Sequence, residues 1–157
     1  MKKYTKYIIC GVVVLVVIIL LVVIFGGRKS ITCTMKSDQS KNGYVLETKY
    51  VIKANKNIVK KVAINETITS KDSKLLDRFE KSFKEQYEYN QKNYNGYTYK
   101  VTNKNGKVLT DVVIDYSEFD MEKFIKNNSA MKEYTDDNKL TLDGAKKLYE
   151  STGATCK

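Results

Sequence analysis

The chain has 157 residues, of which 29% are charged, and its formal net charge at neutral pH is +10. It contains no histidine, so the commonest proton shuttle of enzymes is missing, and its three cysteines show no metal-ligand spacing. This composition argues against zinc sites and histidine-dependent catalysis. We therefore expect no catalytic residue, no metal site and no cofactor.

An apolar segment near the N-terminus is the first predicted element. Nineteen uncharged and almost wholly apolar residues run from Tyr7 to Phe25. A bilayer core of about 30 Å is crossed by roughly 20 helical residues, so this segment predicts a single transmembrane helix. Residues 1–29 then form a short basic N-terminus and membrane anchor, spanning at about 7–25. Residues 30–157 form one extracytoplasmic domain, long enough to bury its own core.

A cleavable signal peptide is the alternative interpretation of this segment. The apolar run is longer than the usual 7–15-residue core of a signal peptide, and no small-residue cleavage site follows it. Lipidation of Cys10 is a second alternative, although Cys10 precedes most of the apolar run instead of ending it. Basic residues flank both sides of the run, so charge alone leaves the orientation open.

Two cysteines mark the ends of the predicted domain, Cys33 and Cys156. Their positions predict a disulfide, which on a chain-entropy model stabilises a loop this long by at most about 5 kcal/mol. Such a bond persists in an oxidising compartment and so favours a location outside the cytoplasm. The alternative is a pair of free thiols in a cytosolic domain.

Lysines concentrate in the first third of the domain. The basic residues flanking the apolar run account for half of the net charge, which leaves the domain at +5. As an alternative function, a lysine-rich hairpin over residues 49–61 would attract an anionic polymer or phospholipid surface over long range. Its candidate binding residues are Lys49, Lys53, Lys56, Lys60 and Lys61. The alternative is a solvated face that discourages strand pairing at an edge.

Three strands are expected first, at Ile31–Ser37, at Tyr44–Lys53 and from Ile58 onward. Alternating apolar residues define one face of each strand. A three-residue loop at 54–56 sets the expected register of the second hairpin. It places Ile52 opposite Ile58, Thr48 opposite Val62, and Leu46 opposite Ile64.

From about Lys71 the apolar period changes to that of a helix, which Ser70 can cap and which ends near Tyr89–Asn93. A strand from Tyr97 follows and leads to Asn105-Gly106, a typical two-residue hairpin turn. The expected pairs there are Val101 with Thr110, Tyr99 with Val112, and Tyr97 with Ile114.

A short helix is expected over 120–125, a polar loop over 127–139, and a last helix that Thr141 caps and Gly153 ends. This order, three strands, a helix, two strands and two helices, favours an α+β domain. We expect an antiparallel sheet of about five strands, covered on one face, after the N-terminal transmembrane helix.

The segment Val113–Glu122, VIDYSEFDME, resembles the strand-to-helix segment of the YehR-like small bacterial lipoproteins. The preceding helix, the Asn-Gly hairpin and the closing helix extend the resemblance over about residues 44–153. It implies a small cell-envelope domain without an assigned activity, so no site residues are carried over. Two features depart from the family: an anchor helix replaces the lipidated cysteine, and the Cys33/Cys156 pair is not part of the lipoprotein pattern.

Two further groups of residues are candidates for chemistry or binding. Calcium binding or a glycosidase mechanism requires neighbouring carboxylates. The densest group of them in the sequence is Asp111, Asp115, Glu118, Asp120 and Glu122. We expect these to be surface charges, with Asp120 capping a helix. Tyr89 and Tyr94 are candidates for an exposed aromatic surface, whereas Tyr87, Tyr97 and Tyr99 are expected to face the core.

The sequence thus predicts a non-enzymatic, single-pass membrane protein whose domain has a binding or structural role in the cell envelope. The expected partners are the membrane and an envelope protein or anionic polymer, and no nucleic acid. Oligomeric state is left open.

Overall fold

The structure is a computed structural model that describes residues 27–157, and the predicted membrane span at 7–25 lies outside them. Within residues 27–157, no helix is both long and apolar enough to cross a bilayer. This part of the chain is an α+β domain, as predicted. Its main elements follow the expected order of three strands, a helix, two strands and two helices.

Six strands build the main sheet: β1 (Arg28–Gln39), β2 (Tyr44–Asn55), β3 (Ile58–Ser70), β4 (Tyr97–Lys104), β5 (Lys107–Asp115) and β8 (Thr155–Cys156). The helices are α2 (Ser73–Asn93), α3 (Met121–Asn127) and α4 (Leu142–Ser151). Between α3 and α4 lie the 3-10 turn η2 (Ser129–Tyr134) and a hairpin of β6 (Thr135–Asp136) and β7 (Lys139–Leu140). The prediction of a plain loop over 127–139 is therefore wrong.

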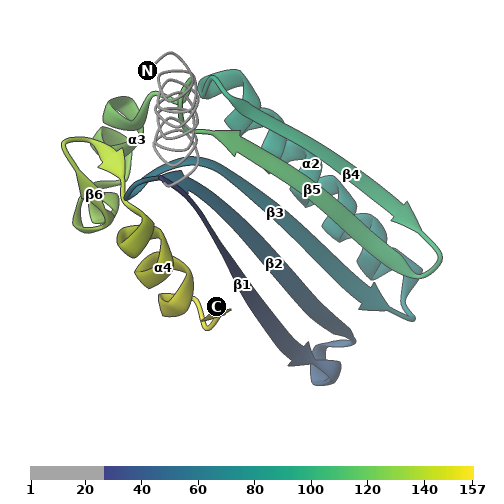
Figure 1. The fold of residues 1–157 in the computed structure, drawn as a ribbon. Helices are drawn as coiled ribbons and strands as arrows, with labels where there is room; N and C mark the ends of the chain where they lie inside the picture. The colour runs from purple at the N-terminus through teal and green to yellow at the C-terminus, as the bar shows by residue number, and fades with distance from the viewer. Residues whose placement is uncertain (1–26) are drawn as a thin grey trace, which may run out of the picture.

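The strand order is β4-β5-β3-β2-β1-β8, and all neighbours are antiparallel. About five strands were expected, and the sixth is β8, which the last residues of the chain form against β1. Figure 1 shows one curved sheet with α2 running along β4 and β5 and α4 beside β1. After β3 the chain forms α2 and then the edge strand β4. It turns back as β5, which pairs with both β4 and β3.

Strand alternation puts the core on the face that carries the helices. Ile52 and Val62 are fully buried on this face, whereas their neighbours Lys53 and Lys61 are exposed on the other. At the α4 end of the sheet, Tyr50 stacks on Tyr149 with ring centroids 4.1 Å apart. At the α2 end, a second buried cluster comprises Leu76, Ile68 and Val108. One sheet face is thus covered, as predicted.

The predicted register of the β2–β3 hairpin is wrong by four residues. Ile52 pairs with Val62, not Ile58, because the strands continue to Asn55 and Ile58 around a two-residue turn. Lys56 adopts a positive φ of 54° in this turn, and a β-bulge leaves Lys60 without a pairing partner on β2. Since four is an even number, the side chains of β3 from Lys61 onward keep their predicted faces. The extra residue at Lys60 reverses the alternation before it, so that Val59, and not Ile58 as predicted, is buried beside Ala54.

The β4–β5 hairpin has the predicted register. Tyr97, Tyr99 and Val101 pair with the three residues expected on β5. Asn105 and Gly106 form the turn with φ values of 53° and 73°, the positive pair that a type I′ turn requires. The residue types of this turn therefore specify the hairpin on their own.

Side-chain caps begin the three helices. The Asp72 carboxylate accepts from the Leu75 N–H and caps α2, so the prediction of Ser70 as the cap is wrong; Ser70 instead donates to the Gly43 carbonyl. The predicted caps of the other two helices are confirmed. Asp120 accepts from the Lys123 N–H, and Thr141 accepts from the Gly144 N–H.

A polar cluster ties α2 to the sheet. Glu66 projects from β3 into the covered face, where its carboxylate accepts hydrogen bonds from the hydroxyls of Tyr87 and Thr110. Burial and the neighbouring Glu66 charge raise the pKa of Tyr87 far above its ordinary value, so the phenol stays protonated and donates. This cluster thus links α2 to β3 and β5 through hydrogen bonds to one carboxylate.

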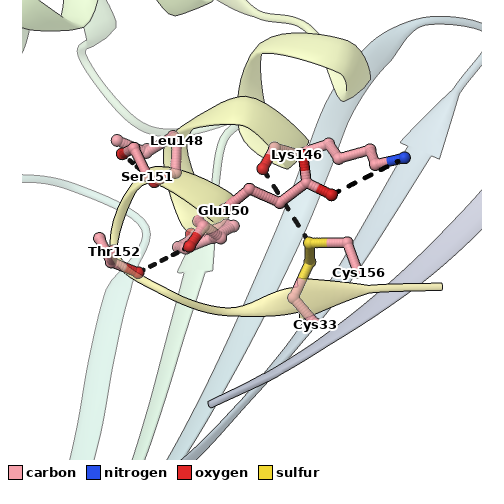
Figure 2. The surroundings of a disulfide bond; sticks show 8 residues. Cys33, Lys146, Leu148, Glu150, Ser151, Thr152 and Cys156 are labelled. Carbon is pink, nitrogen blue, oxygen red and sulfur yellow. Dashed lines mark hydrogen bonds and ion pairs between the residues drawn. A yellow bond between two sulfur atoms is a disulfide. The ribbon is translucent and has the colours of Figure 1, made fainter.

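The predicted Cys33–Cys156 disulfide is present (Figure 2). It joins β8 to β1 across an antiparallel pair whose Cα atoms are 4.0 Å apart. The adjacent residues Thr32 and Lys157 exchange two backbone hydrogen bonds of 2.9 Å each. Cys33 is fully buried under α4, so the bond belongs to the core as well as closing the chain.

Replacing both cysteines in a Cys33→Ala, Cys156→Ala variant should lower the free energy of unfolding by about 2–5 kcal/mol, because a loop spanning 123 positions loses its crosslink. Urea denaturation of the full chain in mild detergent, followed by tyrosine near-UV circular dichroism, measures the change. Reduced wild-type protein is the control and should behave like the variant. An unchanged midpoint in both would contradict a structural role for the disulfide.

Tyr87→Phe should destabilise the domain by about 1–2 kcal/mol, because it removes a buried donor from the Glu66 carboxylate. Tyr89→Phe is the matched control, since Tyr89 lies on the same helix and is 63% exposed. It should change stability by less than about 0.5 kcal/mol. Equal effects in thermal unfolding would show that the Tyr87 hydrogen bond contributes nothing to docking of α2.

Candidate functional site

The lysines predicted as an anionic-partner site gather mostly at one end of the sheet. Lys53 and Lys61 are directly paired across β2 and β3, Lys56 lies in the turn between these strands, and Lys60 lies in the bulge. Lys49 is four residues further along β2, about 13 Å away. It pairs with Asn65 and lines a different hollow on the open face of the sheet.

The start of β1 adds two cations that follow the predicted anchor directly in the sequence. Arg28 pairs with Asn55 and Lys29 with Ala54, so both lie beside the end of β2. The Gly27 carbonyl accepts a hydrogen bond from the Lys56 N–H. The point where the chain enters the domain is therefore fixed against the β2–β3 turn.

Together these segments form an open hollow of about 690 Å³, here called the basic hollow. Its lining residues are Arg28, Lys29, Ser30, Lys53, Ala54, Asn55, Lys60 and Lys61. Five of these eight side chains are cationic. Three of the five predicted lysines line it, whereas Lys56 lies in the adjacent turn and Lys49 lies apart.

Few carboxylates offset this charge. Lys61 forms an ion pair with Asp115 at 3.2 Å. Hydrogen bonds from Ser117, and then the Lys61 charge, lower the pKa of Asp115, so it stays ionised at neutral pH. Over residues 27–157, neither Lys53 nor Lys60 takes part in an ion pair. Like charges directly opposite on neighbouring strands are destabilising, so the Lys53–Lys61 pair has a cost that a bound anion would offset.

The acidic cluster does not assemble into one site. Asp111 is exposed and accepts a hydrogen bond from the Asn65 amide at 2.6 Å, and Asp120 is used in the α3 cap. In the part of the chain that the structure describes, no group of three or more His, Cys, Asp or Glu residues could hold a metal ion. Asp111, Asp115 and Asp120 thus have structural partners of their own.

The predicted aromatic surface is half correct. Tyr89 is exposed, but Tyr94 is only 8% exposed, so its prediction as a surface residue is wrong. Its ring packs on Phe119 and Phe124 with centroids 5.1 and 5.3 Å away. Tyr87 and Tyr97 are buried and Tyr99 is half-buried in the same cluster, so their core-facing prediction is confirmed.

Comparison with known proteins gives a fold and no activity. No protein-family model matches the chain. No curated protein matches it either. Among solved structures, the NMR structure of the Escherichia coli YehR protein is similar, with a TM-score of 0.54 and 18% identity over 83% of this chain and 92% of that one. An NMR structure of a protein from Streptococcus pneumoniae TIGR4 has a TM-score of 0.45 and 16% identity, over 82% of this chain and 86% of that one.

The described domain therefore has a fold like that of YehR, which agrees with the resemblance carried by its strand-to-helix segment. At this level of identity the likeness extends to the fold alone.

Proposed function

We propose that this protein is a membrane-anchored, extracytoplasmic component of the cell envelope with a non-enzymatic binding or structural role. The observation that carries the proposal is the disulfide between Cys33 and Cys156, since such bonds persist in oxidising compartments. The apolar segment Tyr7–Phe25 supplies the anchor in this account. We further propose a relationship to the YehR-like lipoproteins in which this helix replaces the lipid.

A second candidate function is electrostatic binding of an anionic polymer or phospholipid surface by the lysine-rich hairpin 49–61. It is favoured by the basic hollow, where five cationic side chains converge. Phosphate-bearing surfaces attract each nearby lysine or arginine with about 1 kcal/mol. A cluster of this size therefore suffices for measurable, salt-dependent binding. The hollow is open to solvent, which suits a surface better than a small enclosed ligand.

The topology is tested by protease treatment of spheroplasts from cells that express the full chain. We expect the domain to be degraded without lysis, and the anchored fragment to remain in the membrane after carbonate extraction. Protection of the domain until the cells are lysed, or release of the intact chain by carbonate, would contradict the proposal. A cytoplasmic protein probed in the same sample controls for lysis.

The charge of the basic hollow predicts opposite effects for two kinds of variant. Lys53→Gln with Lys60→Gln should weaken binding of the detergent-solubilised chain to phosphocellulose by about 30-fold, since two cations are lost. Asp115→Asn should strengthen it, because Lys61 loses its partner. Salt-gradient elution measures both.

Lys104→Gln with Lys107→Gln is the matched control for these variants. It removes the same charge from a lysine pair at the β4–β5 turn, which is at the other end of β3. If the control elutes as early as the Lys53 and Lys60 variant, retention reflects net charge and the hollow is not the binding site.

A further inference from the structure

We infer that the basic hollow rests on the phosphate groups of anionic phospholipids in the same bilayer that holds the anchor, and so sets the orientation of the domain. This inference depends on the proposed anchorage and adds to it a ligand class and a docking face. It rests on one observation: the chain enters the domain at Gly27, directly beside the basic hollow.

The first step is the length of the connection. Phe25 ends the apolar segment, and Gly27 is already bonded to Lys56 in the β2–β3 turn. Two residues span at most about 7 Å. Gly27 is thus held within about 7 Å of the end of the predicted span, and the turn bonded to it and the adjacent hollow follow directly after it.

The second step is the direction of the strands. β1 leaves this end with twelve residues and runs to η1 (Ser40–Asn42), as Figure 1 shows for the strand and the turn after its arrowhead. At about 3.3 Å per residue, the β1–β2 turn lies roughly 40 Å from the hollow. Toward that far end, Lys36 is paired with Glu47 at 2.8 Å.

The third step is the chemistry of recognition. Lysine ammonium and arginine guanidinium groups form charge-assisted hydrogen bonds with phosphate oxygens. The hollow presents both groups from three neighbouring strands on an open surface. The anchor already holds the domain at the bilayer, so most of the entropy cost of association does not have to be met again on docking. Weak contacts with headgroups are therefore enough to populate the docked state. Phospholipid phosphates are the anions that the connection brings closest, which is why we assign them.

The test uses the full chain in vesicles and an introduced fluorophore. The sequence contains no tryptophan, so an Asn57→Trp probe reports on the hollow end alone and a Lys41→Trp probe on the far end. Both positions are exposed. A quencher attached to the lipid headgroup measures how close each probe lies to the bilayer surface.

We expect the Asn57→Trp probe to be quenched more strongly in vesicles with phosphatidylglycerol than in neutral phosphatidylcholine vesicles, and 0.5 M NaCl to remove the difference. The Lys41→Trp probe should stay unquenched. Adding Lys53→Gln and Lys60→Gln should lower the docked-to-undocked ratio about 30-fold. Lys104→Gln with Lys107→Gln should leave it unchanged.

Two quenching results would overturn the inference while leaving the anchorage intact: equal quenching in both lipids, or equal quenching of both probes. A third such result is that a soluble phosphodiester polymer, at matched phosphate concentration, releases the hollow from the vesicle surface. That result would assign the hollow to a polymer. Flotation of the vesicles distinguishes these three results from a failure of the proposed membrane anchorage. A chain that does not float with vesicles of either composition lacks the anchor itself.

Discussion

The bond between Cys33 and Cys156 is the constraint on which the arrangement of this domain depends. It fixes the last strand of the sheet to the first one and so holds the end of α4 over the core. A two-residue strand such as β8 has too few backbone hydrogen bonds to stay paired without support. The crosslink supplies that support, and because Cys33 is fully buried it also fills space in the core.

The antiparallel pairing of β1, β2 and β3 brings three separate segments to one end of the sheet. The start of β1, the end of β2 and the start of β3 meet there and supply the cations of the basic hollow. Each lysine contributes only about 1 kcal/mol near an anionic surface, which alone would give weak binding. A covalent anchor changes this balance, because docking becomes intramolecular and needs only to orient the domain. The proposed docking face thus depends on the proposed anchor, whereas the anchor does not depend on the docking face.

Local residue chemistry explains how much of the fold could be predicted from sequence. Asn105-Gly106 specifies its own turn, so the β4–β5 register is correct to the residue. The β2–β3 turn gives no such signal, because Lys56 takes a positive φ that its residue type disfavours. The bulge at Lys60 adds a further irregularity that no pattern announces. The predicted faces are correct from Lys61 onward, because a shift of four residues preserves the alternation, whereas the bulge reverses the predicted faces of Ile58 and Val59.

Long-range packing explains what sequence could not predict. Tyr94 follows a helix in a polar stretch and looks exposed, but Phe119 and Phe124 cover it from a segment that lies more than twenty residues away. Arg28 and Lys29 look like membrane flanks because they follow an apolar run, and only strand pairing places them in the basic hollow. The disulfide was predictable because the two cysteines bracket the domain.

The oxidation state of the cysteines in freshly harvested cells tests the account most directly. Cells are quenched in acid, and the denatured, unreduced full chain is treated with a bulky maleimide that shifts its mass on a gel. The account predicts labelling of Cys10 alone, and labelling of all three cysteines only after reduction. Triple labelling without reduction would contradict both the closed domain and its extracytoplasmic location.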